Sequence, residues 1–449
     1  MGISEFQEIE NIYSKNGVSQ IFVKELSAKQ DNDKNQIYLG KDPSNFPGIF
    51  KERGPSNSKS KRKSEYGKNK VEILLNFFWL DHNGVKYHAP NTRIINYFQY
   101  PEIRLSGFLK GCSSSSVPDS LRRVNQQKYG KRFLCLGVNE NNEVLGFVVN
   151  EHEDPLCSNF PVLAESSVSS IIKTHTIGYL GRDPKDLLIN ELKAIKRKGW
   201  HKSVRLPKGY DHPIPFKGNQ GGGYTLEALL GIVSNSKKTP DKYGFEIKAH
   251  QQQKVTLMTP VADLGYEGKS SFKNFMDRYG KKGKKDPTRL VFNGLHRIGK
   301  NQRSTNCTLR LSGYDPINKV LNQDSDKINI ELFNNESGEI ASGWSFKHFL
   351  ESWCNKHQLA CYVPYEKRRC SDKRHDYEYN YGENILICEG TSVIRLIRSI
   401  YDGNVFYDPG HTLYYDGRGK KRPQWRVPLT YNYRYIQNLY NNIEEIPID

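Results

Sequence analysis

The segment between residues 239 and 249 constrains the fold most, because it places two charged side chains at the spacing of a β-strand. It reads Thr239-Pro-Asp-Lys-Tyr-Gly-Phe-Glu-Ile-Lys-Ala249. In a strand, residues two apart point to the same face, so Glu246 and Lys248 are predicted to project together. The alternate residues are predicted to point into the core, and these are Phe245, Ile247 and Ala249. The segment therefore predicts a half-buried strand that presents an acid and an ammonium group.

Two further acids precede this strand in the sequence. Asp241 follows a proline five residues before Glu246. Glu227 lies in a stretch whose apolar residues recur at helical spacing, which predicts a short amphipathic helix. Those apolar residues are Leu226, Leu229, Leu230 and Val233. The glycines at 221–223 are predicted to end a loop just before this helix and to permit close backbone approach.

Residues 255–259 predict the next strand, which we expect to pair with the strand of Glu246. Val255, Leu257 and Thr259 would share one of its faces. Farther along, alternating strands are predicted at 306–313, 328–335 and 360–363. Helices are predicted at 186–198 and 392–401, and a third helix is predicted to begin at Trp344.

The three acids and the lysine suit one kind of chemistry. Two or three carboxylates, here Asp241, Glu246 and Glu227, can hold a hard cation such as Mg²⁺ through oxygen. The cation and the Lys248 ammonium would offset the charge that develops on a phosphodiester attacked by water. A Glu-x-Lys tripeptide on a half-buried strand is, however, more often a solvated ion pair, so the pattern alone leaves both interpretations open.

Four places in the second half of the sequence match one enzyme family. They are Leu192–Trp200, the acid–acid–Glu-x-Lys set, Val255–Pro260 with Phe275–Lys282, and Tyr415–Gly419 through Gln424–Pro428. On these places the chain, from about Leu180 onward, resembles the MvaI/BcnI family of type II restriction endonucleases. The resemblance implies a C-terminal α/β restriction-endonuclease-like domain at 185–449, with a core like the mismatch-repair nickase MutH and a DNA-recognition lobe. It also implies a monomer that uses Mg²⁺, with Glu227, Asp241, Glu246 and Lys248 as the catalytic residues.

The same resemblance assigns residues that contact bases. It implies that Asp416, Arg418 and Arg426 lie on the lobe that reads the sequence of the DNA. Arginine can donate two parallel hydrogen bonds to guanine in the major groove, which discriminates by roughly 1–3 kcal/mol. Thr259 falls where one family member has a different residue near the central base pair, which makes Thr259 a candidate for the choice of that pair. His250 matches one member of the family, and a structural histidine remains an equal alternative there.

The first half of the sequence carries a second, separate resemblance. Gln20–Gln30 and Asn35–Leu39 are similar to the start of the EcoRII-type effector domain, and Asn91–Tyr97 is similar to its second recognition arm. The resemblance implies an N-terminal all-β B3-like pseudobarrel at 1–170, joined by a linker at 171–184. It implies that two loops of this domain grip the major groove. Its candidate DNA contacts are Lys24, Asn35, Gln36, Asn91, Arg93 and Asn96.

Composition is consistent with a nucleic-acid partner. The chain has 449 residues, enough for two or three domains, and a net charge of +18. Such a positive net charge favours a polyanionic partner, because release of counterions drives binding, although charge alone does not separate DNA from RNA or an acidic membrane.

The 8 cysteines form no Cys-x-x-Cys pair, which favours reduced thiols. No signal peptide or apolar run of membrane length is present, so we expect a cytoplasmic protein without a membrane partner. The resemblance to restriction enzymes implies that it is prokaryotic.

Together these features predict a Mg²⁺-dependent, sequence-specific double-strand DNA endonuclease of type IIE. By resemblance, the target is CCWGG, where W is A or T, and the N-terminal domain binds a second copy of the site as effector. A cognate DNA methyltransferase would be its functional partner. Three alternatives remain, of which the first two are a strand-nicking repair endonuclease like MutH and a non-catalytic B3-type regulator. A third, a general basic RNA-binding protein, would not depend on DNA sequence.

Overall fold

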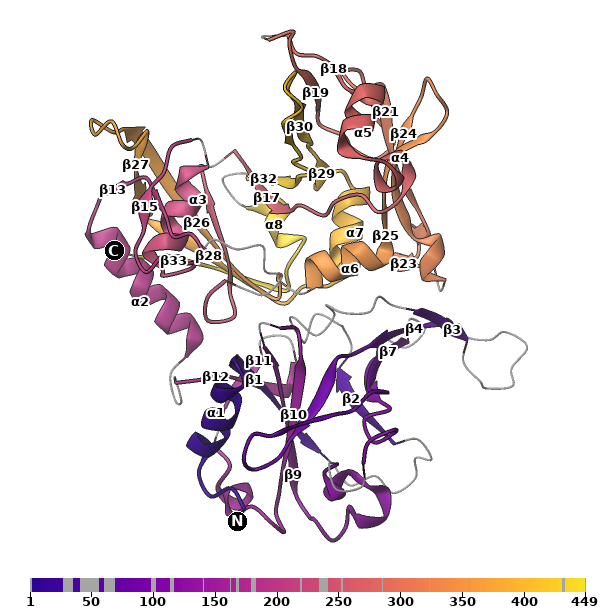
Figure 1. The fold of residues 1–449 in the computed structure, drawn as a ribbon, viewed down its shortest axis with the longest axis vertical. Coiled ribbons are helices and arrows are strands. Elements are labelled where there is room, and N and C mark those ends of the chain that lie inside the picture. The colour runs from indigo at the N-terminus through magenta and orange to yellow at the C-terminus, as the bar shows by residue number, and fades with distance from the viewer. Residues whose placement is uncertain are drawn as a thin grey trace. The chain divides into compact units, whose positions relative to one another are not determined.

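The structure is a computed structural model that describes most of the chain. The described residues are 2–26, 35–40, 56–59, 69–97, 102–113, 117–139, 141–161, 163–166, 169–178, 183–218, 220–233, 241–251, 253–284, 286–322, 324–354, 356–429 and 433–448. They form two compact units, which are described separately below (Figure 1). The first comprises Met1–Ala194, Lys237–Glu246 and Asn355–Leu359. The second comprises Ile195–Ser236, Ile247–Cys354 and Ala360–Asp449.

The first unit is mainly β-structure. Its described strands form a seven-stranded sheet in the order β11-β12-β1-β9-β10-β5-β6 and a five-stranded sheet in the order β2-β8-β7-β4-β3. Neighbouring strands are antiparallel except β10 and β5, which run parallel. The elements are α1 (Phe6–Lys15), β1 (Val18–Leu26), β2 (Gln36–Gly40), β3 (Ser56–Lys59), β4 (Asn69–Leu74), β5 (Phe77–Leu80), β6 (Lys86–His88), β7 (Arg93–Tyr97), β8 (Glu102–Ser106), β9 (Arg132–Asn139), β10 (Val144–Asn150), β11 (Ala164–Ser166) and β12 (Ser169–Thr176).

Helix α1 covers part of the seven-stranded sheet. Phe6, Ile9, Ile12 and Tyr13 recur at three- and four-residue intervals, so they lie on one face of the helix. They are buried in a core shared with apolar residues of β1, β9 and β10. The Tyr13 hydroxyl donates a hydrogen bond of 2.7 Å to the carbonyl oxygen of Cys135. Because this polar atom is satisfied, the tyrosine can be buried without the cost of an unpaired group.

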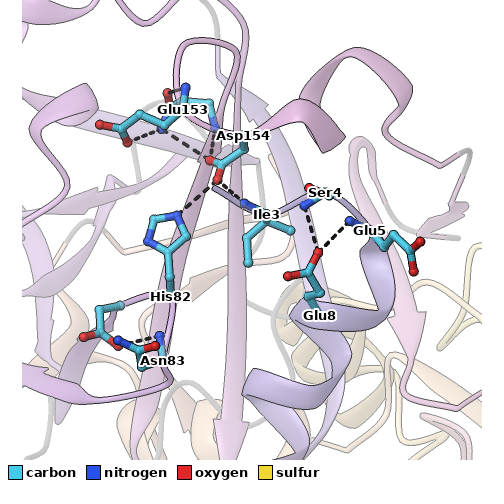
Figure 2. A network of polar contacts seen from close by, with 10 residues as sticks. Ile3, Ser4, Glu5, Glu8, His82, Asn83, Glu153 and Asp154 are labelled. Atoms are coloured by element: carbon cyan, nitrogen blue, oxygen red, sulfur yellow. Dashed lines mark hydrogen bonds and ion pairs between the residues drawn. The ribbon is translucent and has the colours of Figure 1, made fainter. Parts of the chain in front are cut away.

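A buried carboxylate joins the start of the chain to the end of β10 (Figure 2). Asp154 accepts hydrogen bonds from the backbone N–H of Ile3 at 2.8 Å and of Asn150 at 2.9 Å. His82 Nε2 lies 3.1 Å from the same carboxylate. That hydrogen bond raises the pKa of His82 above its ordinary value. Asp154 therefore ties three parts of the first unit together.

Strand β12 extends farther than the expected domain boundary. It pairs with β1 up to the partners Gln20 and Thr176, inside the segment 171–184 that was expected to be a linker. Helix α2 (Pro184–Arg197) then begins at the end of that segment. Residues 171–176 are thus part of a sheet, and the boundaries of the two domains stay a prediction.

The second unit combines helices with several sheets. Its described strands include a sheet in the order β13-β27-β26-β28-β33, with β16 paired to β26, and the sheets β17-β32-β29, β18-β19-β30-β31 and β20-β21-β24-β25. Helix α2 begins in the first unit and ends in the second. The further elements are β13 (His201–Lys202), β14 (Val204–Arg205), β15 (Ile214–Pro215), α3 (Gly221–Leu229), β16 (Glu246–His250), β17 (Lys254–Met258), α4 (Gly265–Lys269), α5 (Phe272–Tyr279), β18 (Lys281–Lys282), β19 (Leu290–Asn293), β20 (Asn301–Gln302), β21 (Cys307–Ser312), β22 (Tyr314–Asp315), β23 (Val320–Leu321), β24 (Asn329–Asn334), β25 (Ile340–Ser345), α6 (Phe346–Cys354), β26 (Leu359–Arg369), β27 (Tyr377–Tyr381), β28 (Asn384–Glu389), α7 (Val393–Tyr401), β29 (Phe406–Tyr407), β30 (Gly410–Leu413), β31 (Gly419–Lys420), β32 (Trp425–Pro428), α8 (Arg434–Gln437) and β33 (Asn442–Pro447).

Most of the elements predicted from residue 186 onward are present. Helices α2 and α7 and strands β21, β24 and β26 lie where periodicity predicted them. The Ser392 hydroxyl caps α7 by accepting from the backbone N–H of Arg395 at 3.3 Å, which explains why that helix begins there. The helix predicted from Trp344 begins at Phe346 instead, because Trp344 belongs to β25 and is fully buried.

The predicted pairing of β16 with β17 is wrong. Strand β17 pairs with β32, placing Val255 opposite Val427, whereas β16 pairs with β26. Both partners lie more than a hundred residues away in the sequence. Local periodicity specifies which face of a strand is buried, and it carries no information about a partner at that distance.

The glycines at 221–223 were expected in a loop, yet they form the first turn of α3. A Cβ at Gly221 would lie 2.3 Å from the Tyr379 hydroxyl, and one at Gly222 would lie 2.3 Å from the Tyr365 ring. Close packing against β26 and β27 therefore requires glycine at both positions. This agrees with the close backbone approach that was expected at residues 221–223. Among the helices of the described ranges, none is long and apolar enough to cross a membrane.

Candidate active site and base-contacting residues

Strand β16 carries the acid and the lysine of the predicted site. Glu246 is only 3% exposed, and Lys248, two residues along the same strand, is half-buried. Ile247, on the opposite face, is buried in the core as predicted. The Glu246 carboxylate lies 3.2 Å from Lys356 Nζ, measured at Oε2. A buried carboxylate needs a cation or hydrogen bonds nearby, and this lysine supplies the cation.

Asp241 is fixed next to the start of β16 by a tight turn. Its backbone N–H donates to the carbonyl oxygen of Phe245 at 2.9 Å, and Phe245 N–H donates back to Lys242 at 2.8 Å. Tyr243 in this turn has a φ of 51°, a left-handed conformation. Glu191 of α2 holds the turn from outside, with its carboxylate 2.6 Å from Lys242 Nζ and hydrogen-bonded to the Tyr243 hydroxyl. The turn thus fixes the backbone of Asp241 beside Phe245, the residue just before β16.

Glu227 lies on α3, as the helical spacing predicted, and is half-buried. Its carbonyl oxygen accepts from the backbone N–H of Ile232 at 2.8 Å, which closes the end of the helix. Thr225, on the same helix, exchanges hydrogen bonds of 3.0 and 3.2 Å with the backbone of Val204. These contacts fix α3 against β14 within the second unit.

The acids of the predicted site have the chemistry that a hard divalent cation requires. All three offer carboxylate oxygens, and the buried Glu246 already has an ammonium group beside it. In donor type and charge these residues fit Mg²⁺. Among the side chains that the structure describes, no group of three or more His, Cys, Asp or Glu residues is arranged to hold a metal ion.

His250 ends β16 and is 3% exposed. Burial lowers its pKa to about 4, because the surroundings disfavour the charged imidazolium. The ring is therefore neutral at physiological pH and carries no charge for binding phosphate. This environment agrees with the structural alternative for His250, and the base-contact assignment stays a prediction.

Arg426 lies in a polar row on the three-stranded sheet β17-β32-β29. Its Nη1 donates to Asp408 Oδ2 at 2.8 Å, and its Nε donates to the Thr256 hydroxyl at 3.0 Å. Lys254 Nζ donates to the same Asp408 oxygen at 2.7 Å. Asp408 therefore holds both cations in place, and part of the Arg426 guanidinium remains exposed.

Asp416 and Arg418 lie in the turn between β30 and β31. Arg418 donates to Asp416 from its backbone N–H at 3.0 Å and from its Nε at 2.6 Å. These two hydrogen bonds lower the pKa of Asp416 below its ordinary value. Gly417 permits the turn with a φ of 81°. The Arg418 side chain is 80% exposed, so it is available to a partner molecule.

Thr259 was expected on one face of the strand with Val255 and Leu257. The structure ends β17 at Met258, so Thr259 lies just beyond the strand and is exposed. The expected face is otherwise confirmed, since Val255 and Leu257 are buried. Exposure leaves Thr259 able to contact a ligand, and its role in choosing a base pair remains a prediction.

The candidate contacts of the N-terminal unit lie on or beside strands β1, β2 and β7. Lys24 lies over the Tyr38 ring at 5.9 Å, and Asn35 donates to the Leu121 carbonyl at 3.3 Å. Arg93 Nε lies 3.5 Å from Glu72. Asn91 donates to the Lys110 carbonyl at 2.9 Å.

Two further candidates from the first unit are Gln36 and Asn96. Gln36 is 8% exposed and accepts from Arg104 Nη1 at 3.4 Å. The backbone of Asn96 belongs to β7, and its side chain lies outside the described residues.

Three residues of these sites were not found from the sequence. Lys356, Asp408 and Glu191 stand in no recognisable motif, and each reaches its partner across at least eighteen residues of chain. Lys356 is separated from Glu246 by more than a hundred residues. Only the folded chain brings these charges together.

Comparison with known proteins places the chain in a family. The MvaI/BcnI restriction endonuclease family matches residues 189–434, which is more than half of the chain. The chain belongs to this family and is a type II restriction endonuclease. No curated protein matches it in a sequence search.

Two solved structures are similar to part of the chain. One is the complex of the restriction endonuclease MvaI with its cognate DNA substrate, at 18% identity and a TM-score of 0.45. The other is MvaI in the absence of DNA, at 15% identity and a TM-score of 0.31. Each comparison covers 59% of this chain and 98% of the other.

Proposed function

We propose that this restriction endonuclease hydrolyses phosphodiester bonds in both strands of double-stranded DNA, at a short site, with Mg²⁺. The observation that carries the proposal is the turn that fixes Asp241 beside β16, the strand of Glu246 and Lys248, in a chain of this family. Duplex DNA as substrate is supported by the MvaI relative, which was solved with its cognate DNA.

In the proposed mechanism Asp241, Glu246 and Glu227 would hold the cation through carboxylate oxygens. A bound Mg²⁺ would supply Lewis-acid stabilisation of charge on the phosphate and make a bound water more acidic. Lys248 orients the attacking water and donates hydrogen bonds to the phosphate oxygens as their charge develops. Lys356 neutralises Glu246 and holds its carboxylate in one position. Hydrolysis leaves a 5′-phosphate and a 3′-hydroxyl.

Base reading is assigned to the second unit. Arg426, held by Asp408 and Thr256, presents a partly exposed guanidinium of the kind that pairs with guanine O6 and N7. Arg418 and Asp416 present a second donor and acceptor on a tight turn, and Thr259 is exposed just beyond the end of β17. The resemblance of both halves makes CCWGG the proposed target.

The first unit is assigned the effector role. Its two sheets and the placement of Lys24, Asn91 and Arg93 on or beside strands are compatible with a B3-like domain that binds a second copy of the site. This domain, residues 1–170, would raise the activity of the domain at 185–449, as type IIE enzymes do. The working enzyme would be a cytoplasmic monomer, with a cognate methyltransferase protecting the host DNA.

Supercoiled plasmids with zero, one or two CCWGG sites test this function. With Mg²⁺, the intact protein should linearise only plasmids that carry a site. A plasmid with two sites should be cut faster than a plasmid with one. Lys248→Ala should abolish cutting, whereas Lys273→Ala, an exposed lysine of α5 paired with Asp277, should cut normally. An open circle that never becomes linear would favour the nickase. Tight site-specific binding without cutting would favour the regulator.

The effector role has its own test with the full chain. A short duplex bearing CCWGG, added in trans, should speed cleavage of a one-site plasmid, because it can occupy the N-terminal domain. A duplex of scrambled sequence is the control and should have no effect. Equal rates with both duplexes would remove the effector assignment and leave the nuclease assignment intact.

A further inference from the structure

One face of the sheet β18-β19-β30-β31, called here the basic face, carries cations and no acid. The register places Lys281 opposite Val291, Val291 opposite Thr412, and Thr412 opposite Lys420. Residues directly opposite in antiparallel strands share a face, so Lys281 and Lys420 project from the same side at the two edges of the sheet. Both lysines are exposed.

The opposite face of this sheet is used for packing. Phe292 and His411, which are also directly opposite, are buried. The Phe275 ring of α5 lies 5.1 Å from Phe292, and the Phe272 ring lies 5.6 Å from His411. Figure 1 shows α5 beside β19 and β30. Since α5 covers that face, the basic face is the side of the sheet that points away from α5.

A third cation extends the basic face. Arg422 is exposed, and its side chain lies against Gly410, where a Cβ would be 3.6 Å from the Arg422 Cβ and Cδ atoms. Gly410 and Thr412 are two apart on β30 and so share a face. Among the described residues no carboxylate lies within ion-pair distance of Lys281, Lys420 or Arg422. Three like charges therefore lie on one face without a counterion, and a polyanion would neutralise them.

The basic face also carries neutral residues that can form hydrogen bonds. Thr412 and Asn293 offer a hydroxyl and an amide on the same side as the lysines. Tyr414 follows β30, and its hydrogen bond with Lys420 lowers the pKa of its phenol below the ordinary value. The Lys420 ammonium lies 5.3 Å from the centre of the Tyr414 ring. Cations mixed with hydroxyl and amide donors are the groups that contact the sugar–phosphate backbone.

The dimensions suit a duplex. Neighbouring strands lie about 4.8 Å apart, so the Lys281 and Lys420 backbones are separated by roughly 14 Å. The major groove of B-form DNA is about 12 Å wide, so the two ammonium groups can meet phosphates on its two sides. The turn that carries Asp416 and Arg418 joins β30 to β31, directly beside Lys420.

We infer that the basic face binds the phosphodiester backbone of duplex DNA beside the bases read by the β30–β31 turn. The inference rests on the proposed function, because that function places duplex DNA at this turn. The basic face contributes affinity that does not depend on sequence, and it fixes the register of Asp416 and Arg418 on the duplex.

The test uses the full chain, without divalent metal so that DNA is not cut. The double variant Lys281→Gln/Lys420→Gln keeps side-chain length and removes both charges. The control is Lys367→Gln/Lys373→Gln, which removes two exposed lysines from the β26–β27 hairpin. Affinity for a short duplex bearing the site, and for one of scrambled sequence, is measured by fluorescence anisotropy over a series of salt concentrations. Thermal unfolding of each variant verifies that it is folded.

Each phosphate contact contributes about 0.9 to the slope of log affinity against log salt. The double variant should therefore lose roughly 2 from that slope and weaken on both duplexes by the same factor, while the control keeps the slope of the intact protein. An unchanged slope, or weakening on the site-bearing duplex alone, would overturn the inference. If the intact protein still cut at its site, the proposed function would survive that result. Failure of the intact protein to bind any duplex would instead overturn the proposed function.

Discussion

The ammonium group of Lys356 lies 3.2 Å from the buried carboxylate of Glu246. Glu246 is the acid of the predicted catalytic strand, and Lys356 comes from the segment just before β26. A carboxylate that is buried for function needs a cation whether or not a metal is bound. Lys356 supplies this cation, which explains how the acid can be buried.

Replacing Lys356 with methionine should destabilise the metal-free protein by about 1–3 kcal/mol, because Glu246 loses its cation and stays buried. Denaturant unfolding measures the change, with Lys373→Met, an exposed lysine of the β26–β27 turn, as the control. Added Mg²⁺ should restore more stability to the variant than to the intact protein, since the ion replaces the lost charge. Equal unfolding free energies for Lys356→Met and the intact protein would show that the ion pair is not needed.

Asp408→Asn should relax the choice of DNA sequence. Asp408 holds Arg426 at 2.8 Å and Lys254 at 2.7 Å, so the variant frees the guanidinium that is proposed to read guanine. The preference for the site over a duplex with one changed base pair should fall roughly tenfold or more, which matches the value of about 1–3 kcal/mol for such a contact. Competition binding measures the ratio. Asp277→Asn, an exposed acid of α5, should leave the ratio unchanged.

Glu267→Gln should destabilise the second unit. Glu267 is 3% exposed, accepts from the Ser342 hydroxyl at 2.6 Å and lies 3.1 Å from Lys421 Nζ. The amide keeps the shape but leaves Lys421 without its counterion, at a cost of about 1–3 kcal/mol. Thermal unfolding checks this, with Glu366→Gln on the exposed end of β26 as the control. A melting temperature equal to that of the control would mean that the charge of Glu267 contributes nothing.

Acidification should destabilise the second unit before its carboxylates titrate. Burial lowers the pKa of His250 and of His296 to about 4, and lowers the pKa of His411 to about 3. Between these values and about 6.5 the unfolded chain binds protons that the folded chain does not, so stability rises with pH across that window and is lost as pH falls. Each histidine contributes up to about 1.4 kcal/mol per pH unit.

Unfolding free energies measured from pH 7 to pH 5 test this prediction. A variant that replaces His296 with glutamine should lose one third of the slope if the three histidines contribute equally. A slope that is flat across the window would contradict the burial of all three rings in the neutral form.

Local sequence patterns predicted much of the second unit. The apolar spacing around Glu227 located α3, and the two-residue alternation from Phe245 to Lys248 located β16 and its buried face. The helix predicted at 392–401 is α7, and the Ser392 hydroxyl accepts a hydrogen bond from its first turn. These features depend on residues that are neighbours in the chain, so the sequence contains all the information that they need.

Long-range contacts could not be predicted in the same way. The pairing of β17 with β32 and the contacts Lys356–Glu246 and Asp408–Arg426 depend on how distant segments pack. Gly221 and Gly222 looked like loop residues, since the tyrosines that exclude a Cβ there lie more than a hundred residues away. The reason for a glycine at these positions becomes clear only once its neighbours in space are known.

The most direct test of the nuclease assignment is single-turnover cleavage by Glu246→Gln, with enzyme in excess over a site-bearing duplex and with Mg²⁺ present. The account predicts that the variant binds the duplex within a few-fold of the intact protein but cuts it at least about 10²-fold more slowly, because a carboxylate that holds the cation has become an amide. Glu366→Gln, which changes an exposed acid on β26, should cut at the normal rate. Cleavage by Glu246→Gln at the rate of the intact protein would contradict the central claim and place the active site elsewhere in the chain.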